Sequence, residues 1–159
     1  MTKSVDEQIR AMRSRWPGFK VIEQDDHSVR WEGVLVPDKR EHLVRVRYRV
    51  PMLLENVSLQ DCQPRVQVIK PVLERHPDYE LGPIPHVYVS KLTPMLPYLC
   101  LFSPEKREWD PSDLIAETTI FWTSEWLYFY EGWLVTKKWR GGGHHPMLVN
   151  GSEKKLEAV

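Results

Sequence analysis

Prolines gather in the middle of this chain: ten of its 13 prolines lie between positions 51 and 111 of 159 residues. Proline lacks a backbone N–H, and its ring clashes with the preceding turn of a helix, so this part of the chain cannot form long helices. We expect it to consist of extended chain and turns, with helices only in the flanking segments. Long irregular connections are uncommon in compact domains and are often functional.

The N-terminal flank predicts one amphipathic helix at residues 5–16. Ser4 and Glu7 have the spacing of a capping box, which satisfies exposed N–H groups at the start of a helix. Pro17 and Gly18 end the helix. The apolar residues at helical spacing are Val5, Ile9, Met12 and Trp16.

The clearest strand is at residues 44–50, where valines and a tyrosine alternate with Arg45, Arg47 and Arg49. A period of two indicates one buried face and one basic, solvated face. Further strands are expected at 19–23, 28–36 and 65–69. Short polar loops connect the first three, so we predict a four-stranded antiparallel meander.

Two helices are expected after the proline-rich part, one capped by Ser112 and one capped at Thr123 or Ser124. Aromatic and apolar residues recur along the second at helical spacing: Trp126, Phe129, Tyr130, Trp133 and Leu134. We interpret this stripe as core or interface rather than as a cofactor site. The order of helix, meander, cysteine-bearing loop and helices predicts an α+β fold with the helices segregated from one sheet.

The charge balance argues against several partners. Lys plus Arg equals Asp plus Glu at 22 each, which gives no electrostatic reason to expect nucleic acid or a membrane surface. We find no signal peptide and no apolar run of membrane-spanning length. We therefore expect a single cytoplasmic domain over residues 1–159, with a flexible tail at about 147–159 and no cofactor.

The chain has two cysteines, Cys62 and Cys100. They lack the spacing of a zinc site, so we expect no metal centre. A free cysteine is most often a buried core residue, and we interpret Cys62 in that way. Cys100 ends the proline-rich part shortly before a helix, a position typical of catalytic groups. Lys106 and Arg107 follow it and could stabilise a thiolate.

The surroundings of Cys100 resemble the active-site segment of ubiquitin-conjugating enzymes. Residues 99–102 read Leu-Cys-Leu-Phe, a Trp-Asp-Pro turn follows at Trp109 to Pro111, and residues 64–68 are similar to the Pro-Pro-x-Val-x-Phe strand of those enzymes. The order of elements also matches over most of the chain. The resemblance implies a ubiquitin-conjugating fold, with Cys100 as the nucleophile and with Trp109 and Pro111 supporting the active site.

Two further runs are similar to the ubiquitin-conjugating-like proteins of bacterial CBASS antiphage operons. They are Trp-Thr-Ser-Glu-Trp-Leu at 122–127 and Trp-Arg-Gly-Gly-Gly-His-His-Pro at 139–146. A short chain such as this resembles the stand-alone type. The resemblance implies that Cys100 forms a thioester with the C-terminus of a cGAS-like nucleotidyltransferase, which makes cyclic oligonucleotides. Transfer of that C-terminus to a lysine then primes antiphage signalling.

The sequence departs from ubiquitin-conjugating enzymes where those carry His-Pro-Asn, whose Asn helps to stabilise the oxyanion. Here residues 85–88 read Pro-His-Val-Tyr, so His86 has no Asn after it. His86 is either a catalytic or a structural histidine. His144 and His145 form either a surface loop or a base that reaches Cys100. The group that stabilises the oxyanion is therefore not assigned: it is either backbone N–H groups or another side chain.

A non-catalytic adaptor of the same fold is the alternative function. It would bind the synthase or a ubiquitin-like partner through the aromatic helices or the arginine face of residues 45–49. No phosphate-binding P-loop is present, so the chain is not expected to adenylate a carboxyl group itself. The lysines that could accept an acyl group are Lys91, Lys106, Lys137 and Lys138.

Overall fold

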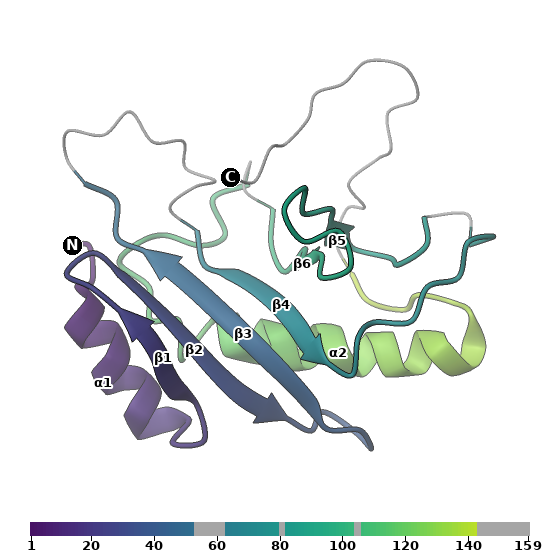
Figure 1. The fold of residues 1–159 in the computed structure, drawn as a ribbon, viewed down its shortest axis with the longest axis horizontal. Coiled ribbons are helices and arrows are strands. Elements are labelled where there is room, and N and C mark those ends of the chain that lie inside the picture. The colour runs from purple at the N-terminus through teal and green to yellow at the C-terminus, as the bar shows by residue number, and fades with distance from the viewer. Residues whose placement is uncertain (53–62, 80–81, 104–105, 143–159) are drawn as a thin grey trace, which may run out of the picture.

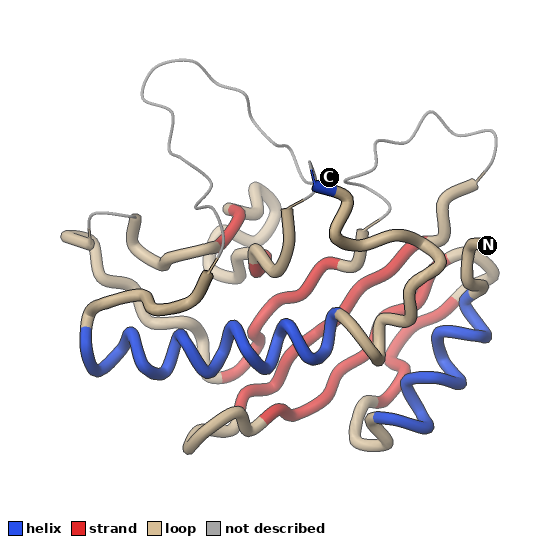
Figure 2. The backbone as a smooth tube through the Cα atoms, turned by 180° about the vertical axis from the view of Figure 1, so that it is seen from behind, coloured by secondary structure: helices blue, strands red, loops and turns tan. Residues whose placement is uncertain are grey.

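The computed structural model describes residues 1–52, 63–79, 82–103 and 106–142. Within them the chain forms one six-stranded sheet and two α-helices. The helix α2 (Thr119–Thr136) covers one face of the sheet, and α1 (Val5–Arg15) lies beside β1 and β2 (Figures 1 and 2). The strands are β1 (Lys20–Gln24), β2 (Ser28–Leu35), β3 (His42–Arg49), β4 (Arg65–Lys70), β5 (Val87–Tyr88) and β6 (Tyr98–Leu99).

The sheet is antiparallel throughout, with the strand order β1-β2-β3-β4-β6-β5. The four strands expected from the sequence occur as β1 to β4. In β3 the alternation has the predicted effect, because Val44, Val46 and Tyr48 are fully buried while Arg47 and Arg49 are exposed. Arg45 forms an ion pair on the outer face with Glu32 of β2 at 2.5 Å.

The prediction of four strands is wrong, since β6 and β5 extend the sheet beyond β4, with β6 next to β4 and β5 at the edge. Each has two residues, too few to show a periodic pattern in the sequence. They are defined instead by their partners: Gln67 of β4 pairs with Tyr98, and Val87 pairs with Leu99. Cys100 therefore follows the end of a strand, and does not lie in the middle of a long loop.

The prediction of two C-terminal helices is also wrong for the described residues, where α2 is continuous and Ser112 caps no helix. Residues 111–118 form turns instead. The buried side chain of Gln8 in α1 contacts this segment: its amide donates to the Asp113 carbonyl at 2.8 Å and accepts from the Ile115 N–H at 3.0 Å. A helix that starts at Ser112 would use the Asp113 carbonyl internally, so Gln8 competes for one of its hydrogen-bond groups, whereas the Ile115 N–H in the first turn would have no intrahelical partner.

The expected cap at Thr123 or Ser124 is wrong for a related reason. Thr123 is buried inside α2, and its hydroxyl donates to the carbonyl of Thr119 at 2.7 Å. A threonine hydroxyl can bond back to the preceding turn in this way, so it is compatible with a helix interior. In the part of the chain that is described, neither helix is long and apolar enough to cross a bilayer.

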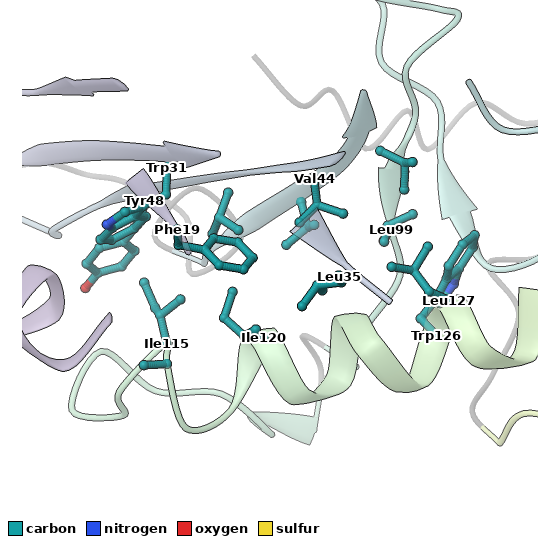
Figure 3. Close-up of a cluster of buried hydrophobic side chains, with 14 of the residues drawn as sticks. Phe19, Trp31, Leu35, Val44, Tyr48, Leu99, Ile115, Ile120, Trp126 and Leu127 are labelled. Atoms are coloured by element: carbon teal, nitrogen blue, oxygen red, sulfur yellow. The ribbon is translucent and has the colours of Figure 1, made fainter. Parts of the chain in front are cut away.

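The core lies between α2 and the inner face of the sheet (Figure 3). At one end α1 is attached to this core, because the Trp16 indole donates to the Ala116 carbonyl at 2.8 Å. The predicted capping box of Ser4 and Glu7 at the start of α1 is confirmed. The aromatic stripe of α2 contributes Trp126, Tyr130 and Trp133, all buried. Phe129 and Leu134 of the predicted stripe are only partly buried, so three of its five residues are core.

Candidate functional site

Cys100 directly follows β6, which lies between β4 and the edge strand β5, and is partly buried. Its backbone N–H donates to the carbonyl of His86 at 2.9 Å. The same carbonyl accepts a second hydrogen bond, at 3.0 Å, from the indole N–H of Trp126 in α2. The His86 carbonyl therefore connects the cysteine backbone to the helix beneath the sheet.

His86 is held in an uncommon conformation by this arrangement. Its φ is 51°, in the left-handed region that residues other than glycine rarely adopt. The residue is buried, and its ring stacks on Trp139 with centroids 5.0 Å apart. Such conformations persist where surrounding contacts fix them. His86 thus positions Cys100 through its backbone, and a role of its ring in proton transfer stays a prediction.

Tyr88 of β5 is the side chain that contacts the cysteine sulfur. The distance from Cys100 Sγ to Tyr88 Oη is 3.3 Å, in hydrogen-bond geometry. A protonated thiol donates to the phenol oxygen, whereas the phenol O–H donates to a thiolate. Tyr88 was not predicted from the sequence, because the two-residue strands β5 and β6 show no pattern there. Tyr88 pairs with Tyr98, and Cys100 lies two residues beyond Tyr98 and thus on the same face.

The surroundings of Cys100 oppose ionisation of its thiol. Burial raises its pKa above the ordinary value, the Tyr88 hydrogen bond lowers it, and the negative charge of Glu108 raises it. Glu108 is held nearby because its carboxylate accepts the Ser103 N–H at 2.6 Å. Lys106 and Arg107, the expected activating cations, are exposed. The charge that acts on the thiol is therefore a carboxylate rather than an ammonium or guanidinium group.

Trp109 and Pro111 anchor the segment after the cysteine. Trp109 is buried and packs edge-to-face on Tyr48 of β3, with ring centroids 5.5 Å apart. The Pro111 carbonyl accepts the Lys3 N–H at 2.8 Å, which ties the turn to the chain before α1. Both residues thus fix the return of the chain to the core, and their support of an active site stays a prediction.

A family model described as the Type II CBASS E2 protein matches residues 8–146. The chain belongs to this family. The match extends from within α1 past the end of α2, so it covers the whole sheet and Cys100. No curated protein matches the chain. Family membership assigns the chain to the CBASS pathway, in which it works together with other proteins.

In this CBASS E2 protein the structure brings together Cys100, Tyr88 and the His86 backbone. His144, His145 and Cys62 lie outside the described residues, as does the predicted tail at 147–159. Within the described ranges, no three histidine, cysteine or acidic side chains gather as a metal site would require. A thiol with a phenol in hydrogen-bond contact has the chemistry to attack a carbonyl carbon and to assist the charge that develops on its oxygen.

Proposed function

We propose that this CBASS E2 protein is an acyl transferase that uses Cys100 as its nucleophile. The observation that supports it best is the contact between the Cys100 sulfur and the Tyr88 hydroxyl, at the end of a strand that the buried core positions. Catalytic groups are commonly placed where a rigid scaffold presents a loop or strand end. Cys100 is partly exposed, so a reactant can reach it.

The reaction has two steps. The Cys100 thiolate attacks an activated C-terminal carbonyl, the leaving group departs with its electron pair, and a thioester forms. A lysine amine then attacks the thioester carbon, loses a proton to a base, and releases the Cys100 thiolate as an isopeptide bond forms. Because the chain has no P-loop, we infer that the carboxyl group is activated elsewhere before it reaches Cys100.

The proposed acyl donor is the C-terminus of a cGAS-like nucleotidyltransferase, and its transfer to a lysine primes antiphage signalling. This partner follows from the resemblance noted above, and membership of a CBASS family supports it. The acceptor is a lysine of a target or of this protein. We further propose that residues 1–159 act as one domain in the cytoplasm, with no resident cofactor or metal.

The decisive experiment traps the adduct. The protein is co-expressed with the nucleotidyltransferase of its operon, and intact mass and non-reducing gels are compared for four forms. We expect a reductant-sensitive adduct with the wild type, a reductant-resistant oxyester with Cys100→Ser and none with Cys100→Ala. Cys62→Ser is the matched control and should retain the adduct. An adduct that survives in Cys100→Ala would exclude Cys100 as the acyl carrier.

One observation favours a second candidate, a non-catalytic adaptor of the same fold. Burial and Glu108 both raise the pKa of the Cys100 thiol, and a protonated thiol is a poor nucleophile. An adaptor would bind the nucleotidyltransferase without covalent chemistry. Co-purification of the two proteins to the same extent with wild type and Cys100→Ala, without any adduct, would support the adaptor.

A further inference from the structure

Three arginines lie next to one another on the outer face of the sheet, the face turned away from α2. Arg47 of β3 is opposite Arg30 of β2 on one side and opposite Arg65 of β4 on the other. We call these three residues the arginine row. In Figure 1 the sheet lies in front of α2, and no described element covers β2 and β3 on this face. Like charges directly opposite each other destabilise a sheet, so the fold keeps a row of charges that its own stability does not favour.

The glutamates on this face pair with the neighbours of Arg47. Glu23 of β1 forms an ion pair with Arg30 at 2.7 Å, and Glu32 of β2 forms one with Arg45 at 2.5 Å. Arg47 lies between those two arginines and is exposed, and it forms no ion pair with any of the described residues. Its guanidinium therefore presents its charge to solvent, in a chain whose formal net charge is zero.

The arginine row ends beside the strand that precedes the cysteine. The Arg65 guanidinium lies over the ring of Tyr98 in β6, 5.6 Å from its centroid. Gln67 of β4 pairs with Tyr98, and Arg65 and Cys100 lie two residues from this pair towards the same end of it. Because successive side chains of a strand alternate between the two faces, Arg65 and Cys100 are on the same face of the sheet. A segment bound along the row would thus lie on the face that carries the thiol.

We propose that the arginine row binds a carboxylate-rich segment of the protein that donates its C-terminus to Cys100. This inference rests on the proposed function and names the surface that holds the donor. Guanidinium groups suit carboxylates because two parallel N–H groups match the two carboxylate oxygens. Complementary charge also speeds the encounter of two proteins and fixes their orientation. A long polyanion such as nucleic acid is disfavoured, because its binding domains carry a net positive charge, which this chain lacks.

Charge reversal at Arg47 separates a binding surface from a merely solvated one. In Arg47→Glu the new carboxylate lies opposite Arg30 and Arg65, so attraction replaces repulsion between the strands. The midpoint of urea unfolding should therefore stay at the wild-type value or rise, which also shows that the variant is folded. Arg10→Glu is the matched control, because Arg10 carries the same charge and is exposed on α1.

The first measurement is the binding of a fluorescein-labelled polyglutamate peptide at low salt, followed by fluorescence anisotropy. Arg47→Glu should weaken this binding by about tenfold or more, since it turns an attraction into a repulsion at the centre of the row. Arg10→Glu should leave it within about twofold of wild type. Unchanged binding in Arg47→Glu would overturn the inference. Tighter binding of a single-stranded DNA of the same net charge would also overturn it, because the surface would then favour nucleic acid.

The second measurement is the rate at which the reductant-sensitive adduct with the nucleotidyltransferase forms. Arg47→Glu should slow it by about fivefold or more at low salt, and the difference should shrink as added salt screens the charges. The rate of Cys100 alkylation by iodoacetamide should stay within about twofold of wild type, because Arg47 acts on docking of the donor and not on the thiol. An equal loss of both rates would assign Arg47 to the reactivity of Cys100 and overturn the docking role.

The two proposals can fail separately. If wild type and Arg47→Glu form the adduct at the same rate, the proposed function stands and the role of the arginine row is overturned. If wild type forms no adduct but polyglutamate binding depends on Arg47, the proposed function fails. The row then binds acidic ligands, and its assignment to the acyl donor is wrong.

Discussion

The β2–β4 part of the sheet and the β5–β6 part are stabilised in different ways. Strands β2 and β3 pair along eight positions and bury a row of valines, whereas β5 and β6 pair at two positions. The β5–β6 part depends on single polar contacts: Trp126 to the His86 carbonyl, and Gln67 to the Leu96 carbonyl at 2.6 Å. The comparison predicts that the stability of the sheet resides mainly in β2–β4, while Cys100 follows one of the two short strands.

The largest expected effect comes from breaking the link between α2 and β3. His42 and Glu131 are both buried, with Nε2 and Oε1 3.0 Å apart, and Glu131 also accepts the Lys39 N–H. Glu131→Ala leaves these groups unpaired and should cost about 3 kcal/mol in the free energy of unfolding, measured with urea. Glu125→Ala, at an exposed position on the same helix, should cost less than about 0.5 kcal/mol. Equal costs would contradict the special role of this pair.

The same substitution in the two parts of the sheet tests the comparison directly. Val46→Ala in β3 removes a fully buried side chain and should cost about 2 kcal/mol, because it leaves a cavity. Val87→Ala in β5 removes a partly buried one and should cost about 1 kcal/mol or less. Urea unfolding of both variants gives the two costs. If Val87→Ala lowers the free energy of unfolding more than Val46→Ala does, the β5–β6 part contributes more to stability than the β2–β4 part, and the comparison is wrong.

Two tryptophans on α2 offer a sharper version of that test. Trp126 donates to the His86 carbonyl, whereas the Trp133 indole N–H has no hydrogen-bond partner among the described residues. Trp126→Phe should therefore lower the free energy of unfolding by about 1 kcal/mol beyond the effect of the smaller buried ring, because a hydrogen bond is also lost. It should also change the alkylation rate of Cys100 by about threefold or more, whereas Trp133→Phe should leave that rate within about twofold. Equal alkylation rates in the two variants would show that the hydrogen bond to the His86 carbonyl does not affect the reactivity of Cys100.

The smallest expected effect is on pH dependence. Burial raises the pKa of the Cys100 thiol in the folded protein, so its alkylation by iodoacetamide should have a midpoint above that of a free thiol. Below the unfolded pKa both states are protonated, and this contribution to stability is complete. It is lost as the pH rises through the folded pKa, since the unfolded thiol ionises first. Wild type should thus lose stability relative to Cys100→Ser in alkaline solution, and parallel pH profiles would contradict this.

The N-terminal helix, the first four strands and much of the core could be predicted because local periodicity encodes them. The capping box fixes the start of α1, the valine–arginine alternation fixes the two faces of β3, and the aromatic stripe fixes the buried side of α2. The residues around Cys100 also indicated the family before the match over residues 8–146 showed it. Each of these features is contained in a short stretch of sequence.

The contacts that define the site could not be predicted in this way, because they join residues that only packing brings together. Tyr88 and Cys100 are 12 positions apart, His86 and Trp126 are 40 apart, and Gln8 and Asp113 are 105 apart. The two-residue strands β5 and β6 are defined by their pairing, and Gln8 bonds to a segment that forms turns where a helix was predicted. The sequence by itself determined which cysteine and which scaffold to expect. Tertiary structure decided that the Tyr88 hydroxyl is in contact with the sulfur.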